Sequence, residues 1–504
     1  MQINILEYLE NTVADDPDKL AYSDGEQGLT FRQTHEFAKS VGSFIAAQGY
    51  RREPVAVCMR KLPETAAAFF GVIYSGCFYV PFDDETPRYR IEMILEIVKP
   101  RAIICDDYMR DHLQGLSYSC ALYDFDEICQ TRADEQLLLS VRSRAIDTDP
   151  IYIVFTSGST GIPKGVAACH RSVIDYIESL SETLSFDRDT VFGNQAPLYV
   201  DACLKDLYST IKTGATTYLI PKQLFMFPLK LIDYLNEHKI NTVCWVVSAL
   251  TMISSFDALK KSVPQYLRLV AFGGEVFPIV QFKKWRAALP EARFVNLYGP
   301  TEATGMSCYF EVTRDFGPDE TLPIGRPFRN TEILLLDDDG HMTDDGAEGE
   351  ICIRGTALTL GYWGDFGKTD ESFAQNPLNS SYRELIYRTG DIGRYNEFGE
   401  LVFVSRRDSQ IKHMGRRIEL GEIEAVASNI DGLRGACCIY DEKRGRLVLY
   451  YTGDRVSAEV TAFLKEKLPR YMTPHAIIQI GAMPLTANGK IDRNALARET
   501  RDSG

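Results

Sequence analysis

Apolar and polar positions alternate in blocks along the chain. Four short apolar runs have the length and composition of buried β-strands: 55–57, 102–104, 151–155 and 269–272. Between and before them, apolar residues recur with helical spacing at 6–9, 37–45, 62–75 and 229–238. Strands that alternate with helices are typical of α/β proteins with mixed or parallel sheets. We therefore expect an α/β fold in which helices flank the sheets.

The pattern changes near residue 407. Upstream, Tyr395–Leu401 is typical of a turn-rich hairpin. Downstream, the chain predicts a compact α+β unit with helices at 421–429 and 458–468 and strands at 436–440 and 446–451. The sequence thus predicts a large N-terminal domain of mixed β-sheets with flanking helices, residues 1–407, and a small α+β C-terminal domain, residues 408–504.

Charge and composition exclude several classes of function. The 504 residues carry 55 Lys and Arg against 70 Asp and Glu, a net charge of −15, which argues against a general binder of nucleic acid or of anionic membranes. The N-terminus lacks the features of a signal peptide, and the apolar stretch 243–253 is too short to insert into a membrane. The 12 cysteines are scattered without a CxxC pair. Together these features predict a cytoplasmic protein.

One segment combines the residues that bind phosphate. An apolar strand leads into Thr156, Ser157, Gly158, Ser159, Thr160 and Gly161, and Lys164 follows after a proline. Glycines let backbone N–H groups converge on an anion, hydroxyls add donors, and a lysine adds a point charge. Pro163 excludes the Walker A pattern. The alternative is a plain turn rich in glycine and serine.

Thr156–Gly165 resembles the signature loop of adenylate-forming enzymes, the superfamily of acyl-CoA synthetases, luciferases and nonribosomal peptide synthetase (NRPS) adenylation domains. Further motifs follow in the order of that family: Tyr79–Pro81, Asn296–Glu302, Gly349–Ile353, Tyr387–Asp391, Arg406–Lys412, Gly415–Glu424, Leu468–Met472 and Asn488–Arg493. The organisation is most similar to freestanding amino-acid adenylation domains, which include D-alanine–carrier protein ligases. The resemblance implies ATP and Mg²⁺ as cofactors.

The resemblance also implies roles for individual residues. The expected nucleotide site consists of Thr156, Ser157, Gly158, Ser159, Thr160, Gly161, Lys164, Gly273, Gly274, Glu275, Asn296, Tyr298, Gly299, Thr301, Asp391 and Arg406. The expected catalytic residues are Lys490, Thr301 and Glu302, with Glu302 as the Mg²⁺ ligand and Asp408 as the hinge of the small domain. Taken singly, each of these residues is better explained by an ordinary role: Tyr298 in a core, Asp391 in a turn, and Glu302 and Lys490 on an exposed surface.

Asp201 bears on which carboxylic acid is activated. Amino-acid-activating members of the family carry an aspartate at this position, where it pairs with the substrate's α-ammonium group. The substrates of acyl- and aryl-acid activators have no such group, so a buried aspartate there would be a costly unpaired carboxylate. The alternative is a helix N-cap. The family's pocket positions correspond to Asp201, Ala202, Lys205, Cys244, Ala271, Gly273, Leu297, Gly305, Met306 and Lys490. Lys205 favours an acidic or polar substrate side chain, unless it pairs with Asp201 four residues earlier or extends away from the pocket.

The function implied is ATP-dependent formation of an aminoacyl-AMP with release of pyrophosphate, followed by transfer to the phosphopantetheine thiol of a peptidyl or acyl carrier protein. The substrate is then an acidic or polar amino acid or D-alanine. Few residues follow Arg493, so we expect either a freestanding enzyme or a unit of a larger synthetase. Two alternatives stay open, an acyl- or aryl-CoA ligase of the same fold and an inactive adenylate-binding regulatory protein.

Overall fold

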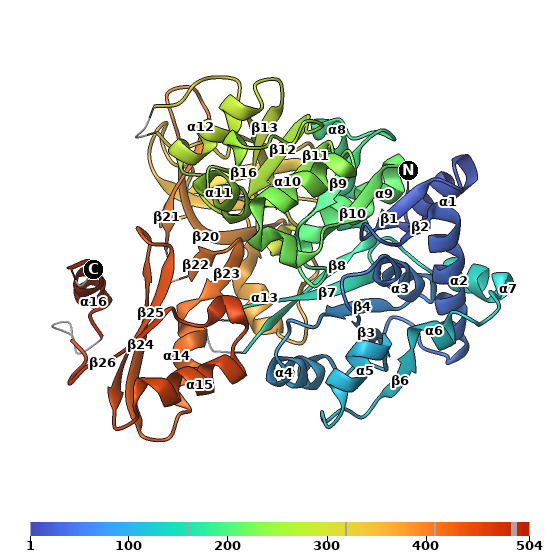
Figure 1. The fold of residues 1–504 in the computed structure, drawn as a ribbon, viewed down its shortest axis with the longest axis horizontal. Coiled ribbons are helices and arrows are strands. Elements are labelled where there is room, and N and C mark those ends of the chain that lie inside the picture. The colour runs from blue at the N-terminus through green and yellow to red at the C-terminus, as the bar shows by residue number, and fades with distance from the viewer. Residues whose placement is uncertain (1, 159–161, 318–319, 408–409, 485–490, 503–504) are drawn as a thin grey trace.

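The computed structural model describes residues 2–158, 162–317, 320–407, 410–484 and 491–502. Figure 1 shows a large lobe that holds the N-terminal and middle parts of the chain, and a smaller lobe, drawn in orange and red, that holds the C-terminal part. This α/β architecture with a large N-terminal and a small C-terminal domain confirms the predicted fold class. The boundary after residue 407 stays a prediction.

The longest sheet has nine strands in the order β15-β14-β13-β12-β11-β9-β10-β1-β2. Its centre, from β1 to β13 through β10, β9, β11 and β12, is parallel, and its edges are antiparallel. Its strands are β1 (Leu20–Ser23), β2 (Gly28–Thr30), β9 (Val191–Asn194), β10 (Thr216–Leu219), β11 (Thr242–Val246), β12 (Leu269–Gly273), β13 (Arg293–Tyr298), β14 (Cys308–Glu311) and β15 (Arg326–Pro327).

A second sheet has seven strands in the order β18-β8-β7-β4-β3-β5-β6. They are β3 (Pro54–Cys58), β4 (Phe78–Phe82), β5 (Ala102–Cys105), β6 (Ala121–Asp124), β7 (Pro150–Thr156), β8 (Lys164–Cys169) and β18 (Gly361–Tyr362). The two sheets share one hydrophobic core, and α3 (Pro63–Tyr74) lies within it. All residues of α3 except Glu64 are buried, because the helix is apolar on nearly all sides.

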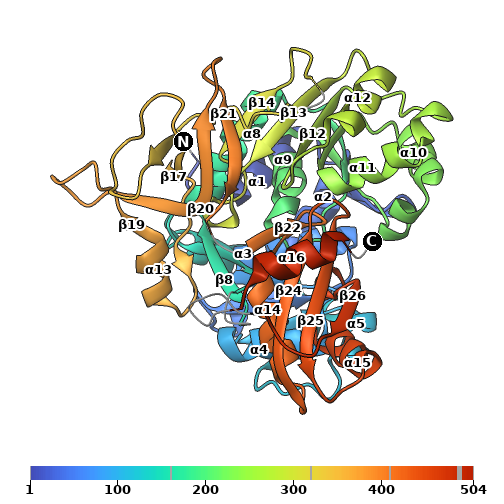
Figure 2. The ribbon, with the colours of Figure 1, turned by 90° about the vertical axis from the view of Figure 1, so that its left-hand side faces the viewer.

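A third sheet completes the large lobe. It contains β16 (Thr331–Leu336), β17 (Gly349–Gly355), β19 (Phe373–Gln375), β20 (Leu385–Tyr395) and β21 (Leu401–Arg406), with β21 paired to β20. The small lobe has a hairpin of β22 (Gln410–His413) and β23 (Arg416–Glu419), and a sheet of β24 (Leu433–Asp441), β25 (Arg446–Gly453) and β26 (Ala476–Gln479). The hairpin is one part of the small lobe that contacts the large one (Figure 2).

Helices cover the sheets. In the large lobe they are α1 (Leu6–Asp15), α2 (Phe31–Ala47), α4 (Arg88–Val98), α5 (Asp107–Leu113), α6 (Phe125–Ile128), α7 (Glu135–Arg142), α8 (His170–Leu184), α9 (Leu204–Thr213), α10 (Pro228–Glu237), α11 (Val247–Ser255), α12 (Ile279–Ala288) and α13 (Phe366–Ser372). In the small lobe they are α14 (Leu420–Ser428), α15 (Ser457–Lys467) and α16 (Arg493–Asp502). Single turns of 3₁₀ helix occur at η1 (Asp201–Cys203), η2 (Lys222–Met226), η3 (Ala258–Lys260), η4 (Thr301–Ala303) and η5 (Arg470–Met472).

The small lobe has its own core on the two faces of its sheet. Residues of α14 and α15 pack on one face together with Ile418 of the hairpin. Leu496 of α16 packs on the other face, against Cys437 and Tyr450. Figure 1 places α15 beside α4 of the large lobe and α16 on the far side. The small lobe thus contacts the large one through the hairpin and the α14–α15 face.

Candidate functional site

The expected site residues gather where the parallel strands of the nine-stranded sheet end. Gly273 ends β12, Tyr298 ends β13, and Glu302 lies in the 3₁₀ turn η4 directly after β13. Ligands of open α/β sheets bind at the carboxyl ends of their strands. The third sheet supplies Asp391 and Arg406, which lie opposite each other in the β20–β21 register. The predicted constellation therefore comes together at one place.

Tyr298 and Asp391, the residues expected to hold the nucleoside, contact each other directly. The Tyr298 hydroxyl donates to Asp391 Oδ2 at 2.6 Å, and the Arg406 guanidinium also binds this carboxylate. Arg406 further donates to the carbonyl of Thr389 at 3.2 Å. Lys412, from the hairpin, lies 5.3 Å from the centre of the Tyr298 ring. An aromatic face next to a buried carboxylate is what a purine nucleoside with two ribose hydroxyls requires.

Other expected nucleotide residues have structural partners. The amide of Asn296 donates to the Pro323 carbonyl at 2.8 Å. Both carboxylate oxygens of Glu275 accept backbone N–H groups, one from Ser248 and one from Gly415 of the small domain, each at 2.9 Å. Gly299 has no room for a larger residue, because a Cβ there would lie 2.1 Å from a carbonyl oxygen. Gly274 has φ +84°, a backbone conformation that favours glycine. These residues shape the site through its backbone.

The phosphate loop contacts the small domain. Ser157 Oγ donates to the carbonyl of Arg417 at 2.8 Å and accepts the backbone N–H of Glu419 at 3.2 Å. Lys164 Nζ lies 3.9 Å from Glu419 Oε1. Burial lowers the pKa of Lys164, and the nearby positive charge of Arg417 adds to this effect. Thr156 Oγ1 is buried without a partner among the described residues, and Ser159, Thr160 and Gly161 lie outside them.

Glu302 is fully buried, at 0% exposure. Tyr362 donates to it at 2.7 Å, and Arg417 Nη1 lies 2.8 and 3.0 Å from its two oxygens. Burial acts to raise the pKa of Glu302, but the charge of Arg417 and the Tyr362 hydrogen bond outweigh it, so that pKa is lowered. A buried, charged oxygen donor of this kind suits a hard cation such as Mg²⁺.

The positions expected to line the acid-binding pocket lie on the same strand ends. Cys244 of β11 pairs in register with Ala271 of β12, and Gly273 pairs with Leu297 of β13. A Cβ on Gly273 would lie 2.3 Å from the Leu297 carbonyl oxygen, so only glycine fits between these strands. Gly305 has φ +122° and lies against the ring of the buried Tyr176. Tyr176 thus lies beside an expected pocket position, and the sequence motifs did not identify it.

Asp201 and Lys205 lie on the same helical segment, followed by a glycine C-cap at Gly214. Asp201 is the first residue of η1, and Val200 is the N-cap, without a side-chain capping bond. Lys205 is only 3% exposed and forms no hydrogen bond or ion pair within the described part of the chain. Burial raises the pKa of Asp201, against the lowering effects of the Thr301 hydroxyl and of Lys205. Neither a capping role, an Asp201–Lys205 ion pair nor a solvent-directed lysine matches this geometry.

A second acid and a second lysine extend this cluster. Asp206, next to Lys205, is buried and accepts from Asn194 Nδ2 at 2.7 Å. Burial raises the pKa of Asp206 to about 6, although Lys205, Asn194 and Lys61 act against it. Lys61 Nζ donates to the carbonyls of Asn194, Gln195 and Ile220 at 3.0 to 3.3 Å. No motif pointed to these residues, because Asp206 and Lys61 lie 145 positions apart (206 − 61) in the sequence.

The small domain contributes four side chains that sequence reasoning did not assign to the site. Lys412, Arg417, Glu419 and Glu422 all lie within the motif segments 406–412 and 415–424, so the motifs marked the region but not the contacts. Asp408 and Lys490 lie outside the described residues, and their roles stay predictions. Arg493 binds Glu424 at 2.7 Å and the Cys438 carbonyl at 3.0 Å.

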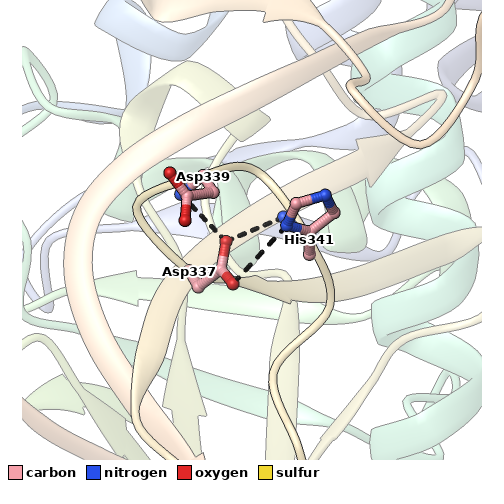
Figure 3. A group of neighbouring side chains, drawn as sticks. All are labelled: Asp337, Asp339 and His341. Atoms are coloured by element: carbon pink, nitrogen blue, oxygen red, sulfur yellow. Dashed lines mark hydrogen bonds and ion pairs between the residues drawn. The ribbon is translucent and has the colours of Figure 1, made fainter.

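Two aspartates and a histidine form a separate group of neighbouring side chains after β16. Asp337, Asp339 and His341 bring potential ligand atoms within 4.8 Å of one another (Figure 3). Asp337 Oδ1 accepts the backbone N–H groups of Asp339 and His341 at 3.0 and 2.8 Å. These bonds shape a surface turn. The group is separate from the site described above.

Among the described residues, no helix has the length and apolar character that crossing a membrane requires.

A sequence profile described as AMP-binding enzyme matches residues 9–363 of this chain, and one described as AMP-binding enzyme C-terminal domain matches residues 422–490. The chain belongs to the AMP-binding enzyme family. The predicted resemblance to adenylate-forming enzymes is thereby confirmed, and the members of this family are adenylate-forming ligases.

Curated relatives include large synthetases. Bacitracin synthase 1 of Bacillus licheniformis is 30% identical over 99% of this chain, and tyrocidine synthase 2 of Brevibacillus parabrevis is 32% identical over 96% of it. The chain spans 9% and 13% of the lengths of these two proteins. It therefore matches one unit within each of them.

Solved structures agree with this AMP-binding fold. The protein IdnL1 has a TM-score of 0.82 at 27% identity, with 96% of this chain and 98% of that chain covered. PA1221, described as an NRPS protein containing adenylation and PCP domains, has a TM-score of 0.84 at 25% identity, with 99% and 84% covered. The adenylation domain AlmE of Vibrio cholerae matches in fold, with a TM-score of 0.86 at 21% identity over 100% and 98% of the two chains. NRPS-type adenylation is the coarse function that these matches support.

Proposed function

We propose that the chain activates an amino acid with ATP and Mg²⁺ and passes it to the phosphopantetheine thiol of a carrier protein. In the first step, a carboxylate oxygen of the substrate bonds to the α-phosphorus of ATP, and pyrophosphate leaves with the electron pair of the broken P–O bond. In the second, the thiol sulfur bonds to the carbonyl carbon, AMP leaves, and the thiol proton is released. A cytoplasmic location stays a prediction.

The observation that carries the proposal is Asp201 at the start of a buried helix with no capping duty. A carboxylate in this position is unfavourable unless a cation pairs with it. The Thr301 hydroxyl and the charge of Lys205 support its ionised form only partly, because its pKa remains raised. An α-ammonium group of the substrate would complete the pairing. A fatty or aryl acid has no such group, which is why we favour an amino acid over the acyl- or aryl-CoA ligase alternative.

The charges of the pocket further favour an acidic side chain on the substrate. Asp201 and Asp206 bring two carboxylates, and Lys205 and Lys61 bring two ammonium groups. The α-ammonium and α-carboxylate of an amino acid cancel each other in charge, and the α-ammonium would pair with Asp201. A carboxylate on the side chain would provide the buried ammonium of Lys205 with a partner. A neutral substrate such as D-alanine would leave Lys205 unpaired.

The nucleotide is assigned to the opposite end of the site. Tyr298 would present its ring to the adenine, and Asp391 with Arg406 would hold the ribose. Bound Mg²⁺ would neutralise developing phosphate charge, with Glu302 as its ligand and Thr301 as a hydrogen-bond donor to phosphate. The assignment of a cation to Glu302 fits a buried carboxylate whose pKa is lowered.

A substrate pair that differs only in charge tests the specificity. We would compare glutamate with glutamine and aspartate with asparagine in ATP–pyrophosphate exchange, using the wild-type protein, Lys205→Met and Lys205→Arg. Wild type and Lys205→Arg should prefer the acid, and Lys205→Met should lose that preference by about 10- to 100-fold, the size of one charge-assisted interaction. An unchanged preference in Lys205→Met would exclude contact between Lys205 and the substrate.

The acceptor is tested separately. The enzyme with its aminoacyl-AMP would be mixed either with holo carrier protein or with free coenzyme A, at equal thiol concentration. Thioester on the carrier with little on coenzyme A is the expected result. Faster transfer to coenzyme A would favour the CoA-ligase alternative.

A further inference from the structure

Two buried acceptor oxygens next to Lys205 have no hydrogen-bond partner. They belong to Asn194 of β9 and Asp206 of α9, which are 0% and 1% exposed. Asn194 Nδ2 donates to Asp206 Oδ2 at 2.7 Å. The other oxygen of each group, Asn194 Oδ1 and Asp206 Oδ1, is unpartnered within the part of the chain that the structure describes. Because buried polar atoms without partners are costly, these two acceptors require a donor.

A single proton would supply that donor. A carboxylic acid and a primary amide can join through two hydrogen bonds, one from the amide N–H and one from the acid O–H. The N–H bond from Asn194 to Asp206 is present. A proton on Asp206 Oδ1 would turn that oxygen into a donor for the Asn194 carbonyl oxygen. The surroundings therefore suit a neutral Asp206, whereas an ionised Asp206 leaves both oxygens unpaired.

The cations that act on Asp206 are Lys205 and Lys61. Lys61 lies between β3 and α3, and its Nζ donates to three carbonyls. Burial lowers the pKa of Lys61 to about 7, against the charge of Asp206. Three donated hydrogen bonds need three N–H bonds, which only the ammonium form has.

The other titratable groups that face Asp206 are two thiols and a phenol. Burial raises the pKa of each of them above its usual value, so they are neutral and contribute no charge. They are Cys203 of η1, Cys244 of β11 and Tyr176 of α8.

We propose that Asp206 is a positioning residue that takes up a proton when an acidic side chain of the substrate binds to Lys205. The inference rests on the proposed function, because it uses the assignment of the substrate's side-chain carboxylate to Lys205. In the empty pocket, Asp201 and Asp206 balance the charges of Lys205 and Lys61. A zwitterionic substrate keeps this balance, but an acidic side chain adds one negative charge that these four residues do not cancel.

The proton restores the balance. It passes from the solvent to Asp206 Oδ1, where one O–H bond forms, and no other covalent bond changes. Asp206 becomes a neutral acid paired with Asn194, and Lys205 keeps its charge for the substrate. An amide side chain brings no charge, so Asp206 stays ionised when an amide binds. Asp206 thus acts on the choice between acid and amide through Lys205, without touching the substrate.

Calorimetric titration in two buffers of different ionisation enthalpy, such as PIPES and imidazole, counts the protons taken up on binding. The ligands are L- and D-glutamate, L- and D-aspartate and their amides, with α,β-methylene-ATP present so that no adenylate forms. A new like charge nearby raises the pKa of a carboxyl by about 1 to 3 units, and the pKa of Asp206 starts at about 6. At pH 7 an acid should therefore take up about half a proton or more, and its amide almost none. Equal uptake for an acid and its amide, or no binding of any acid, would overturn the proposal.

Asp206→Asn separates proton uptake from a purely structural role. Asparagine can still accept from Asn194, but it has no proton to gain. This variant should show no uptake with an acid and should bind that acid about tenfold or more tightly than the wild type at pH 8, because it permanently resembles the protonated form. At pH 6 the two proteins should differ less. The control Asp233→Asn, at an exposed aspartate of α10, should behave like the wild type.

Two results with Asp206→Asn would overturn the proposal. Persistent uptake would place the proton elsewhere, for example on Lys61. Weaker binding of the acid at every pH would show that Asp206 only supports the fold of the pocket. If this variant does not fold, the difference in uptake between acid and amide in the wild-type protein decides.

ATP–pyrophosphate exchange in the wild-type protein distinguishes the two levels of inference. Proton-linked binding of an acid without exchange for any amino acid would contradict the proposed function and support the role of Asp206. Exchange with an acidic amino acid whose binding takes up no proton would support the function and overturn the role of Asp206.

Discussion

Arg417 of the small domain holds both carboxylate oxygens of Glu302 of the large domain, at 2.8 and 3.0 Å from a single guanidinium nitrogen. Their positions in the chain are 115 residues apart. Burial acts to raise the pKa of Glu302, and the charge of Arg417 is the largest of the effects that lower it. The pKa of the expected metal ligand therefore depends on a residue of the small domain.

Glu302→Gln should remove metal-dependent activation. The amide keeps the size and the Tyr362 contact but loses the charge that suits Mg²⁺. We expect ATP–pyrophosphate exchange to fall by about 100-fold or more, because metal stabilisation of phosphate charge is worth several kcal/mol. The measurement is exchange rate against Mg²⁺ concentration. A variant with wild-type rate and wild-type Mg²⁺ dependence would contradict the assignment of Glu302.

Asp201→Asn should impair recognition of the amino acid and spare the nucleotide. The substitution keeps the shape but removes the partner proposed for the α-ammonium group, an interaction of about 1.5 to 3 kcal/mol, or about 10- to 100-fold. Amino-acid KM in the exchange assay should rise by this factor, while calorimetric binding of Mg-ATP stays unchanged. Equal losses in both measurements would indicate a folding defect instead of lost recognition.

Gly158→Ala should displace the phosphate loop. A Cβ at this position would lie 1.9 Å from the carbonyl oxygen of Ile162, a clash that only backbone movement relieves. Misplacing a substrate-positioning group by about 1 Å can reduce rate by about 100-fold, and we expect a loss of this order in exchange. Gly367→Ala is the matched control, because its Cβ would meet nothing closer than 3.9 Å. Similar activities for the two variants would count against a phosphate role for the loop.

Asp83→Asn should stabilise the protein in a pH-dependent way. Burial, with Glu85 and Asp84 nearby, raises the pKa of Asp83 from 3.8 to about 7. Between these values the native state binds a proton that the unfolded state has lost, so the contribution of Asp83 to the free energy of unfolding falls as pH rises. Asparagine keeps an acceptor for the Glu85 N–H and the Thr86 hydroxyl without this loss.

The gain in unfolding free energy should therefore be near zero at pH 4 and grow to roughly 2 to 4 kcal/mol at pH 8, on the scale of about 1.4 kcal/mol for each pKa unit. Chemical denaturation of both proteins at pH 4, 6 and 8 measures it. A difference that does not change with pH would contradict the assigned pKa.

Local pattern was enough to predict much of the fold. The apolar run 269–272 became β12, and the helical spacing at 62–75 became α3, because these segments are buried and their residue types decide their structure. The small domain's helix at 458–468 became α15, Ser457–Lys467. Strand order was not predictable from these patterns, since β9 pairs with both β10 and β11 through contacts between distant segments.

The site was predicted unevenly for a similar reason. Tyr298, Glu302 and Asp391 were identified through motifs and come together in the structure. Lys61 and Asp206 lie in no motif, and their proximity arises from the packing of α9 against the sheet. The contacts of Arg417 and Glu422 depend on how the two domains meet, which residue types and spacing do not specify.

We predict that the substrate is an amino acid, and in particular an acidic one. The most direct measurement is ATP–pyrophosphate exchange against L- and D-aspartate, L- and D-glutamate, their amides, L- and D-alanine, and a set of aryl and fatty acids. We predict exchange with an acidic amino acid well above the signal of its amide and of alanine. Exchange with aryl or fatty acids alone would contradict the role of Asp201 and move the chain to the acyl-ligase branch of its family.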